Sequence, residues 1–169
     1  MLRIVLCMVC VAVIMTSCLK NDGDASCPYE NTSINAPQAE RDSIEAFLTS
    51  MNIQAEEHST GFYYQVVTNG TDIGQMGLCS EIKIDYSGKL KNGTQFDKQS
   101  GIRFILGSLI EGWKKGIPLI KKGGRITLFI PPSLAYGKNE VKDNQGVVVI
   151  PSNSMLVFDV SLIDYTVGN

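Results

Sequence analysis

The side chains that most often act as nucleophiles, general bases or metal ligands are scarce in this sequence. It has one histidine, His58, in the polar stretch 52–60, where we expect a solvated side chain. No Ser/His/Asp or Cys/His arrangement can be built around that histidine. The cysteines are too few and wrongly spaced to form a zinc site with it. We therefore expect no metal and no cofactor. The five cysteines are Cys7, Cys10, Cys18, Cys27 and Cys79.

The other residues that draw attention are aromatic, together with one carboxylate among them, Asp97. A tryptophan on a short helix that faces a sheet usually belongs to a core, and so does a phenylalanine on an alternating strand. Asp97 follows a hairpin signal and can be a plain turn residue. Residue types alone therefore favour a core over a pocket. The aromatic residues are Tyr86, Phe96, Phe104, Trp113, Tyr136 and Phe158.

Length and composition limit the classes of protein that need to be considered. The chain has 169 residues, a hydrophobic fraction of 44% and a formal net charge of −2. That length indicates one domain with extensions, and that hydrophobic fraction is enough for a packed core. No concentrated basic surface is visible, so we do not expect a nucleic-acid partner.

The N-terminus has the pattern of an export signal followed by a lipid anchor. An apolar run of 12 residues, 4–15, follows Arg3. A spanning helix needs about 20 such residues, so the run fits a secretory signal better. The next residues, ending in Cys18, resemble the lipobox of bacterial lipoproteins. The resemblance implies cleavage after residue 17 and a diacylglycerol on Cys18, and multiple acyl chains hold a protein stably at a bilayer. A plain signal peptide is the alternative.

The segment between this signal and the main domain divides into two parts. Residues 18–36 are rich in Asn, Asp, Ser and Gly, which predicts a flexible tether. Residues 37–60 are predicted to form an amphipathic helix, 37–51, and a polar link. The helix packs on its own domain or on a partner, and its short length favours a monomer. Export permits a disulfide between Cys27 and Cys79, but their distance in sequence leads us to expect none.

From residue 61 onward the chain has the pattern of a small antiparallel sheet. Apolar and polar residues alternate in several short segments, and a hairpin signal stands at 91–94. A short helix is predicted at 109–119. One helix cannot cover both faces of a five-stranded sheet. We therefore predict an α+β fold in which a twisted five-stranded antiparallel half-barrel wraps around one short helix. The expected strands are 62–67, 82–86, 103–106, 126–130 and 156–162.

Eight short phrases between residues 61 and 165 occur together in the order and spacing of one family. They resemble the FKBP-type peptidyl-prolyl cis–trans isomerases, and they imply an isomerase domain at 61–166 with the half-barrel fold. The phrases are Tyr86-Ser87-Gly88, Gly93-Thr94-Gln95-Phe96-Asp97, Phe104-Ile105-Leu106-Gly107, Ile110-Glu111-Gly112-Trp113, Gly123-Gly124, Ala135-Tyr136-Gly137, Ile150-Pro151 and Leu156-Val157-Phe158-Asp159-Val160.

The resemblance also implies a site for an Xaa-Pro peptide bond. Trp113 would form the base of a pocket, and the Tyr136 hydroxyl and the backbone N–H of Ile150 would bind carbonyl oxygens. Asp97 would act through its charge and by orientation, not as a proton carrier. The implied catalytic set is Asp97, Tyr136, Trp113 and Phe158, and the implied substrate-binding set is Tyr86, Phe96, Phe104, Leu109, Ile110 and Ile150.

Such a pocket suits the rotation of an amide bond. The rotation costs about 18–20 kcal/mol because resonance holds the amide planar. A twisted amide has lost resonance and much of its dipole, so an apolar pocket stabilises it more than the planar form. The reaction breaks no bond and needs no nucleophile, metal or cofactor.

The sequence thus predicts a peptidyl-prolyl isomerase that assists the folding of exported proteins. The partners would be Xaa-Pro segments, rapamycin- or tacrolimus-type macrolides, and a membrane reached through the lipid anchor. The expected location is the envelope of a Gram-negative bacterium, at the outer membrane. The alternatives are a non-catalytic FKBP-fold chaperone or adaptor that binds Pro-containing segments, and a structural envelope lipoprotein without a pocket.

Overall fold

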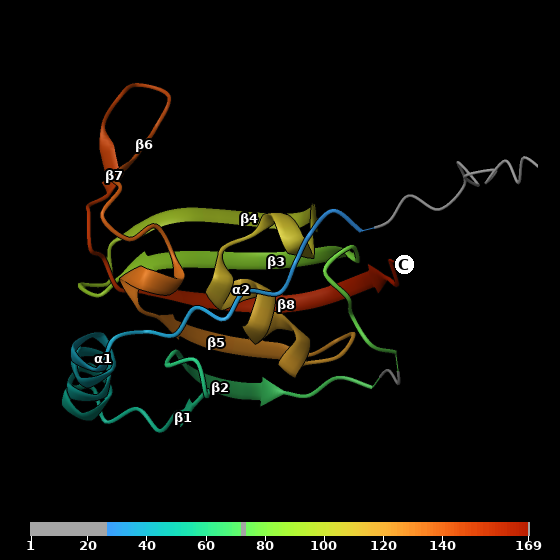
Figure 1. Cartoon of the computed structure of the whole chain (residues 1–169), viewed down its shortest axis with the longest axis horizontal. Helices are drawn as coiled ribbons and strands as arrows, with labels where there is room; N and C mark the ends of the chain where they lie inside the picture. Colours follow the sequence, from blue (N-terminus) through green and yellow to red (C-terminus); the bar gives the residue numbers. More distant parts are fainter. Residues whose placement is uncertain (1–26, 72–73, 169) are drawn as a thin grey trace, which may run out of the picture.

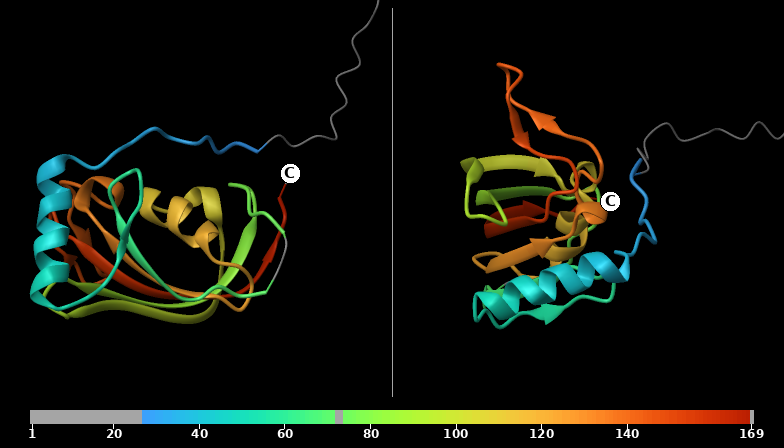
Figure 2. Two further views of the ribbon diagram at one scale, coloured as in Figure 1. Left: turned by 90° about the horizontal axis from the view of Figure 1, so that it is seen from below. Right: turned by 90° about the vertical axis from the view of Figure 1, so that its left-hand side faces the viewer.

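A six-stranded antiparallel sheet forms the body of the molecule (Figure 1). The computed structural model describes residues 27–71 and 74–168. The sheet order is β1-β2-β5-β8-β3-β4, and the sheet curves around a short helix, α2 (Figure 2). The predicted α+β half-barrel is therefore confirmed. The strands of this sheet are β1 (Glu56–Glu57), β2 (Tyr63–Thr68), β3 (Glu81–Leu90), β4 (Gln95–Ile105), β5 (Arg125–Ile130) and β8 (Leu156–Thr166).

The core lies between the concave face of the sheet and α2. Along β8, Leu156, Phe158, Val160 and Leu162 are buried while the residues between them are partly exposed. This period of two places one apolar face of the strand against the helix. The apolar residues that alternate in the sequence of this strand are therefore the ones that are buried in the core.

The sheet has one more strand than the predicted five, and β3, β4 and β8 are longer than predicted, β4 by the most. β1 is a two-residue edge strand that pairs with β2 through Glu56 and Glu57, inside the stretch expected to be a link. β4 begins at Gln95 instead of residue 103. Both additions consist largely of polar residues and are held by backbone pairing, so a search for alternating apolar residues does not detect them.

The polar stretch 137–149 contains most of a small hairpin. Strands β6 (Val141–Lys142) and β7 (Val148–Ile150) pair with each other and project from the body (Figures 1 and 2). The Asp143 carboxylate accepts hydrogen bonds from the backbone N–H groups of Gln145 and Val147, which closes the turn.

The helices lie where the sequence predicts them, with shorter bounds. α1 (Gln38–Ser50) occupies the predicted 37–51. The predicted 109–119 helix is α2 (Glu111–Gly116) followed by the 3₁₀ turn η2 (Ile117–Leu119). The missing N–H of Pro118 accounts for the early end of the regular helix. A second 3₁₀ turn, η1 (Leu106–Ser108), precedes α2.

α1 packs on its own domain across one end of the sheet (Figure 2). Ile44 and Leu48 are buried in a second apolar cluster with Tyr63, Phe129 and Met155. These partners come from β2, β5 and the approach to β8. Of the two arrangements left open for this helix, the structure therefore has the intramolecular one.

Residues 27–36 form an N-terminal strap that is held against the domain, which corrects the expectation of a flexible tether for this part. The strap runs from α1 past α2 to the opposite end of the molecule (Figure 2). There Cys27 forms a disulfide with Cys79, although 52 positions separate them in sequence. The expectation of no bridge is therefore wrong, because the path of the strap brings two distant cysteines together. Ala36, at the other end of the strap, is 6% exposed.

His58 is half-buried, whereas the polar character of its segment predicts a solvated side chain. Its ring stacks on Phe62 with 4.4 Å between centroids, and Nδ1 lies 2.9 Å from Thr60 Oγ1. Burial, together with the positive charge of Lys115, lowers the pKa of His58. The ring therefore has a packing role.

The expected signal peptide, residues 1–17, and the expected lipidation site, Cys18, lie outside the described residues, as does the tether up to residue 26. Both stay predictions. None of the helices in the described part of the chain is long and apolar enough to cross a membrane.

Candidate active site

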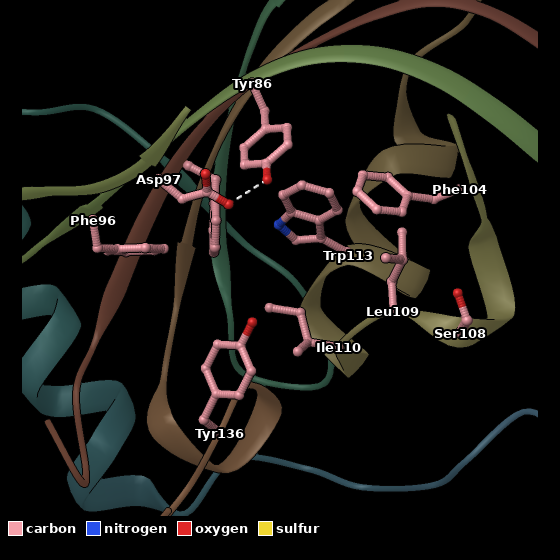
Figure 3. Close-up of a pocket in the computed structure, with 10 residues that line it drawn as sticks. Tyr86, Phe96, Asp97, Phe104, Ser108, Leu109, Ile110, Trp113 and Tyr136 are labelled. Atoms are coloured by element: carbon pink, nitrogen blue, oxygen red, sulfur yellow. Dashed lines mark hydrogen bonds between the residues drawn. The ribbon is translucent and has the colours of Figure 1, made fainter. Parts of the chain in front are cut away.

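A cavity of about 340 Å³ opens between α2 and the concave face of the sheet (Figure 3). Its lining comes from β3, β4, η1, α2, β8 and the segment after β5, so it joins residues distant in sequence. Nine of the ten lining residues are among those that the family resemblance implied. The lining consists of Tyr86, Phe96, Asp97, Phe104, Ser108, Leu109, Ile110, Trp113, Tyr136 and Phe158.

The indole of Trp113 forms the base of this cavity. Three aromatic rings meet it edge to face: Phe158 at 4.9 Å, Tyr86 at 5.1 Å and Phe104 at 6.4 Å between centroids. Such T-shaped contacts are favourable for aromatic pairs and restrict the ring to one orientation. Trp113 is only 4% exposed, and the part of its ring that these neighbours leave uncovered contributes to the lining of the cavity.

Two glycines of α2 allow the helix that carries Trp113 to lie close to the sheet. A Cβ added at Gly112 would come within 2.6 Å of the Ile130 side chain, and one at Gly116 within 2.6 Å of Leu128. Both contacts are with β5. The absence of side chains on this face of α2 thus sets the depth at which Trp113 stands above the sheet.

Gly88 of β3 has the corresponding role on the opposite wall. A Cβ at this position would lie 2.6 Å from Phe96 and 2.8 Å from Phe158. Because Gly88 has no side chain, these two rings approach to 5.6 Å and stand perpendicular to each other. Together they form the apolar wall beside Asp97.

The polar side of the cavity is organised around the Asp97 carboxylate. The Tyr86 hydroxyl donates a hydrogen bond to Oδ2, and the backbone N–H of Lys98 donates one to Oδ1 at 2.7 Å (Figure 3). Burial, this hydrogen bond and the negative charge of Asp97 raise the pKa of Tyr86 far above its ordinary value. Tyr86 therefore stays protonated and acts as a donor to Asp97.

Tyr136 stands opposite this pair, just after the 3₁₀ turn η3 (Pro132–Leu134). Its ring is 38% exposed, and its hydroxyl points into the cavity (Figure 3). Burial and the charge of Asp97 raise the pKa of Tyr136. This hydroxyl is thus a neutral donor at the mouth of an apolar cavity.

A further polar atom at the cavity is the Nε1 of Trp113, which is buried and has no hydrogen-bond partner among the described residues. The nitrogen lies on the side of the ring that faces Asp97 (Figure 3). The site therefore combines aromatic walls with a few fixed polar groups. Among the described residues, no group of three or more His, Cys, Asp or Glu side chains could hold a metal ion.

Ile150 does not line this cavity, whereas Ser108, which sequence reasoning missed, does. Ile150 is 3% exposed and borders an adjoining cavity of about 420 Å³, to which Phe96, Asp97 and Tyr136 also belong. Its implied role as a backbone donor stays a prediction. The only feature of the sequence that could have indicated Ser108 is its position next to Leu109. In the structure its hydroxyl donates a hydrogen bond to the Ile105 carbonyl at 2.7 Å.

A half-barrel with an aromatic cavity over the inner helix α2 is the arrangement expected of an FKBP-type isomerase domain, and comparison with known proteins gives the same class. The family model described as FKBP-type peptidyl-prolyl cis-trans isomerase matches residues 76–163. The chain belongs to this family.

Two curated bacterial relatives have the name FKBP-type peptidyl-prolyl cis-trans isomerase FkpA. The protein from Escherichia coli K12 is 45% identical over 111 residues, which is 63% of this chain and 38% of the relative. The protein from Buchnera aphidicola of Schizaphis graminum is 44% identical over 89 residues, which is 50% of this chain and 33% of the relative. The chain thus spans well under half the length of these relatives.

Two solved structures share the fold. The crystal structure of FkpA from Escherichia coli has a TM-score of 0.64 at 34% identity, and the match covers 78% of this chain and 65% of that one. The peptidyl-prolyl cis-trans isomerase from Pseudomonas syringae has a TM-score of 0.63 at 26% identity, with 78% of this chain and 98% of that one covered.

Proposed function

We propose that this protein is a peptidyl-prolyl cis–trans isomerase that accelerates rotation about Xaa-Pro bonds in exported polypeptides. The observation that carries the proposal is the cavity above Trp113, with aromatic walls on one side and the Tyr86–Asp97 pair and the Tyr136 hydroxyl on the other. Membership of the isomerase family supports it.

In this proposal the proline ring rests on the indole of Trp113 between the rings of Tyr86, Phe96 and Phe158. The apolar surroundings destabilise the planar amide, with its large dipole, relative to the twisted one. The Tyr136 hydroxyl donates a hydrogen bond to a carbonyl beside the rotating bond and holds it in the twisted geometry. Each 1.36 kcal/mol gained in this way changes the rate about tenfold.

Asp97 has an electrostatic role in this mechanism. Its carboxylate is oriented by Tyr86 and by the Lys98 backbone, so its negative charge stands at a fixed place on the cavity wall. The carbonyl carbon and nitrogen of a twisting amide redistribute charge, and a fixed charge in a low-dielectric site acts strongly on that change. No proton transfer is required.

A protease-coupled or exchange assay on a short Xaa-Pro peptide tests the proposal. We expect the wild-type protein to accelerate the isomerisation and Trp113→Ala to lose most of that acceleration. An unchanged rate with wild-type protein, equal to that with Trp113→Ala, would contradict it. Rapamycin or tacrolimus is expected to bind the same cavity and to inhibit.

The second candidate function is a chaperone or adaptor that holds Pro-containing segments without turnover. The β6–β7 hairpin favours it, because this hairpin projects from the body (Figure 1) and leaves Val147 and Val148 57% and 39% exposed. Suppression of aggregation of an unfolded client, measured with an inactive Trp113→Ala variant, separates the two functions. Retained suppression without isomerase activity supports the holding function.

We further propose that the mature protein is a monomer held at the cell envelope, at the outer membrane of a Gram-negative bacterium, by a lipid on Cys18. The lipobox-like segment supports the anchor, and the Cys27–Cys79 disulfide is typical of exported proteins. Burial of the apolar side of α1 within the domain supports a monomer. Labelling with a radioactive fatty acid that disappears in Cys18→Ser tests the anchor, and light scattering tests the monomer.

A further inference from the structure

We infer that α1, which lies outside the family-matched residues, positions Tyr136 through the carboxylate of Glu40. The inference deepens the proposed function and rests on it. It concerns an element that lies before the residues that the family model matches, 76–163.

The contact that carries the inference joins residues 93 positions apart. Glu40 Oε2 accepts a hydrogen bond from the backbone N–H of Ser133 at 3.0 Å. Ser133 is the second residue of η3, and the first N–H groups of a helical turn have no partner within the turn. A carboxylate at this place satisfies one of them with a charge-assisted bond. Glu40 thus caps the turn from outside.

Glu40 is held in place by the packing of α1. It lies in the first turn of that helix, where its own N–H bonds the Pro37 carbonyl at 3.0 Å. One helical turn later, Ile44 is fully buried against the β-sheet. Ahead of the helix, Ala36 N bonds the Thr60 carbonyl at 2.8 Å. The carboxylate is therefore presented to η3 by an element fixed on both sides.

The capped turn sets the position of Tyr136. Backbone N–H groups of Ala135 and Gly137 both bond the Pro132 carbonyl, at 2.9 and 2.8 Å, so Tyr136 lies between two residues held by the same oxygen. Gly137 has a φ of +59°, which turns the chain directly after Tyr136. A shift of η3 therefore moves the tyrosine ring, and catalytic geometry is sensitive to displacements of about 1 Å.

Other contacts also hold η3, which limits the expected effect of losing Glu40. Leu134 is fully buried, and the Gly137 carbonyl accepts a hydrogen bond from Asn153 N at 2.7 Å. Loss of the Glu40 carboxylate should therefore loosen the turn and leave the domain folded. Glu40 is a positioning residue and does not contact the substrate.

The test compares Glu40→Ala with Glu40→Gln, since both remove the charge but only glutamine keeps an oxygen acceptor. We expect kcat/KM on an Xaa-Pro peptide to fall about three- to tenfold in Glu40→Ala, the effect of one lost hydrogen bond. Glu40→Gln should stay within about twofold of wild type. The control is Glu45→Ala, an exposed carboxylate further along the same helix, which should leave the rate unchanged.

A double-mutant cycle with Tyr136→Phe separates positioning from a general structural effect. If Glu40 acts through the Tyr136 hydroxyl, Glu40→Ala should cause little further loss in a Tyr136→Phe background. If the loss of kcat/KM in the double variant equals the product of the losses in the two single variants, the inference is overturned. An equal loss in Glu40→Gln and Glu40→Ala would also overturn it.

Amide hydrogen exchange gives a readout that needs no activity. The Ser133 amide should exchange faster in Glu40→Ala than in wild type and Glu40→Gln, whereas amides of β3 and β8 should be unchanged. Equal exchange at Ser133 in all three proteins would overturn the inference. A wild-type protein without isomerase activity would instead contradict the proposed function, and the exchange result would still decide whether Glu40 holds η3.

Discussion

Tyr86 joins the apolar and polar halves of the cavity, because its ring stands edge-on to Trp113 at 5.1 Å while its hydroxyl bonds Asp97. The two residues of the hydrogen bond lie on the paired strands β3 and β4. The pairing shifts register between Ile84 and Tyr86, and again after Gly88. Such irregularities re-aim side chains, and here they flank the segment that brings Tyr86 and Asp97 together.

Tyr86→Phe is predicted to lower activity while keeping the fold. The ring contacts with Trp113 remain, but Asp97 loses one of the two donors that orient it and keeps the Lys98 backbone N–H. We expect kcat/KM to fall about three- to tenfold, as for one buried hydrogen bond, in the isomerase assay. Asp97→Asn should cause a loss of at least the same size. Unchanged activity in Tyr86→Phe would show that the orientation of Asp97 is unimportant.

Gly88→Ala is predicted to disturb the aromatic wall. The added methyl would meet Phe96 and Phe158 at less than 3 Å, so one ring must move into the cavity. Overpacking of this kind costs about 1–3 kcal/mol, and both the free energy of unfolding and kcat/KM should fall. Gly77→Ala is the matched control, since its methyl would have 3.6 Å of space to the nearest atom. Equal stability of the two variants would contradict the prediction.

The sequence predicts the elements with apolar alternation well. The core strands and the inner helix follow from periodicity, and the presence of Trp113 and Phe158 in one cavity follows from the resemblance to the family. Ser108 lies at the edge of the same cavity, but its residue type and spacing carry no signal. Its participation depends on how η1 turns, which is a tertiary property.

The parts that the sequence did not predict depend on contacts between distant polar residues. The N-terminal strap reads as a linker because it lacks large apolar residues, yet its Thr32 bonds Glu111 and its Cys27 bonds Cys79. Neither partner can be identified from local pattern. Glu40 likewise looks like one of several exposed helix carboxylates, and only the packed position of α1 brings it to Ser133.

Removal of the disulfide is predicted to destabilise the protein without abolishing activity. Cys27→Ser/Cys79→Ser frees a loop of 52 positions, and loss of such a crosslink costs roughly 2–4 kcal/mol. Chemical denaturation should show this difference, and the reductant dithiothreitol should lower wild type to the stability of the double variant. Because neither cysteine lines the cavity, kcat/KM well below the melting temperature should change less than twofold. Wild type that is equally stable with and without reductant would contradict the prediction.

The Glu111 carboxylate is expected to make the stability of the protein depend on pH under acidic conditions. It is 14% exposed and accepts hydrogen bonds from Thr32 at 2.5 Å and Lys115 at 2.9 Å, and it also pairs with Lys114. Burial alone would raise its pKa, but these hydrogen bonds and the lysine charge outweigh burial and lower the pKa from an ordinary 4.5 to about 2. The group therefore binds a proton less readily in the folded than in the unfolded chain.

Linkage gives the sign of the effect. The contribution of Glu111 to the free energy of unfolding is fully present above about pH 4.5, and it is lost as the pH falls through 2. We expect a loss of roughly 1–3 kcal/mol over this range from this group. Glu111→Gln should be less stable than wild type at pH 7, and the two proteins should converge near pH 2. Urea unfolding at a series of pH values measures this difference, with Glu45→Gln as the exposed control. A constant gap between wild type and Glu111→Gln from pH 7 to 2 would show that the strap is held to α2 without the charge of Glu111.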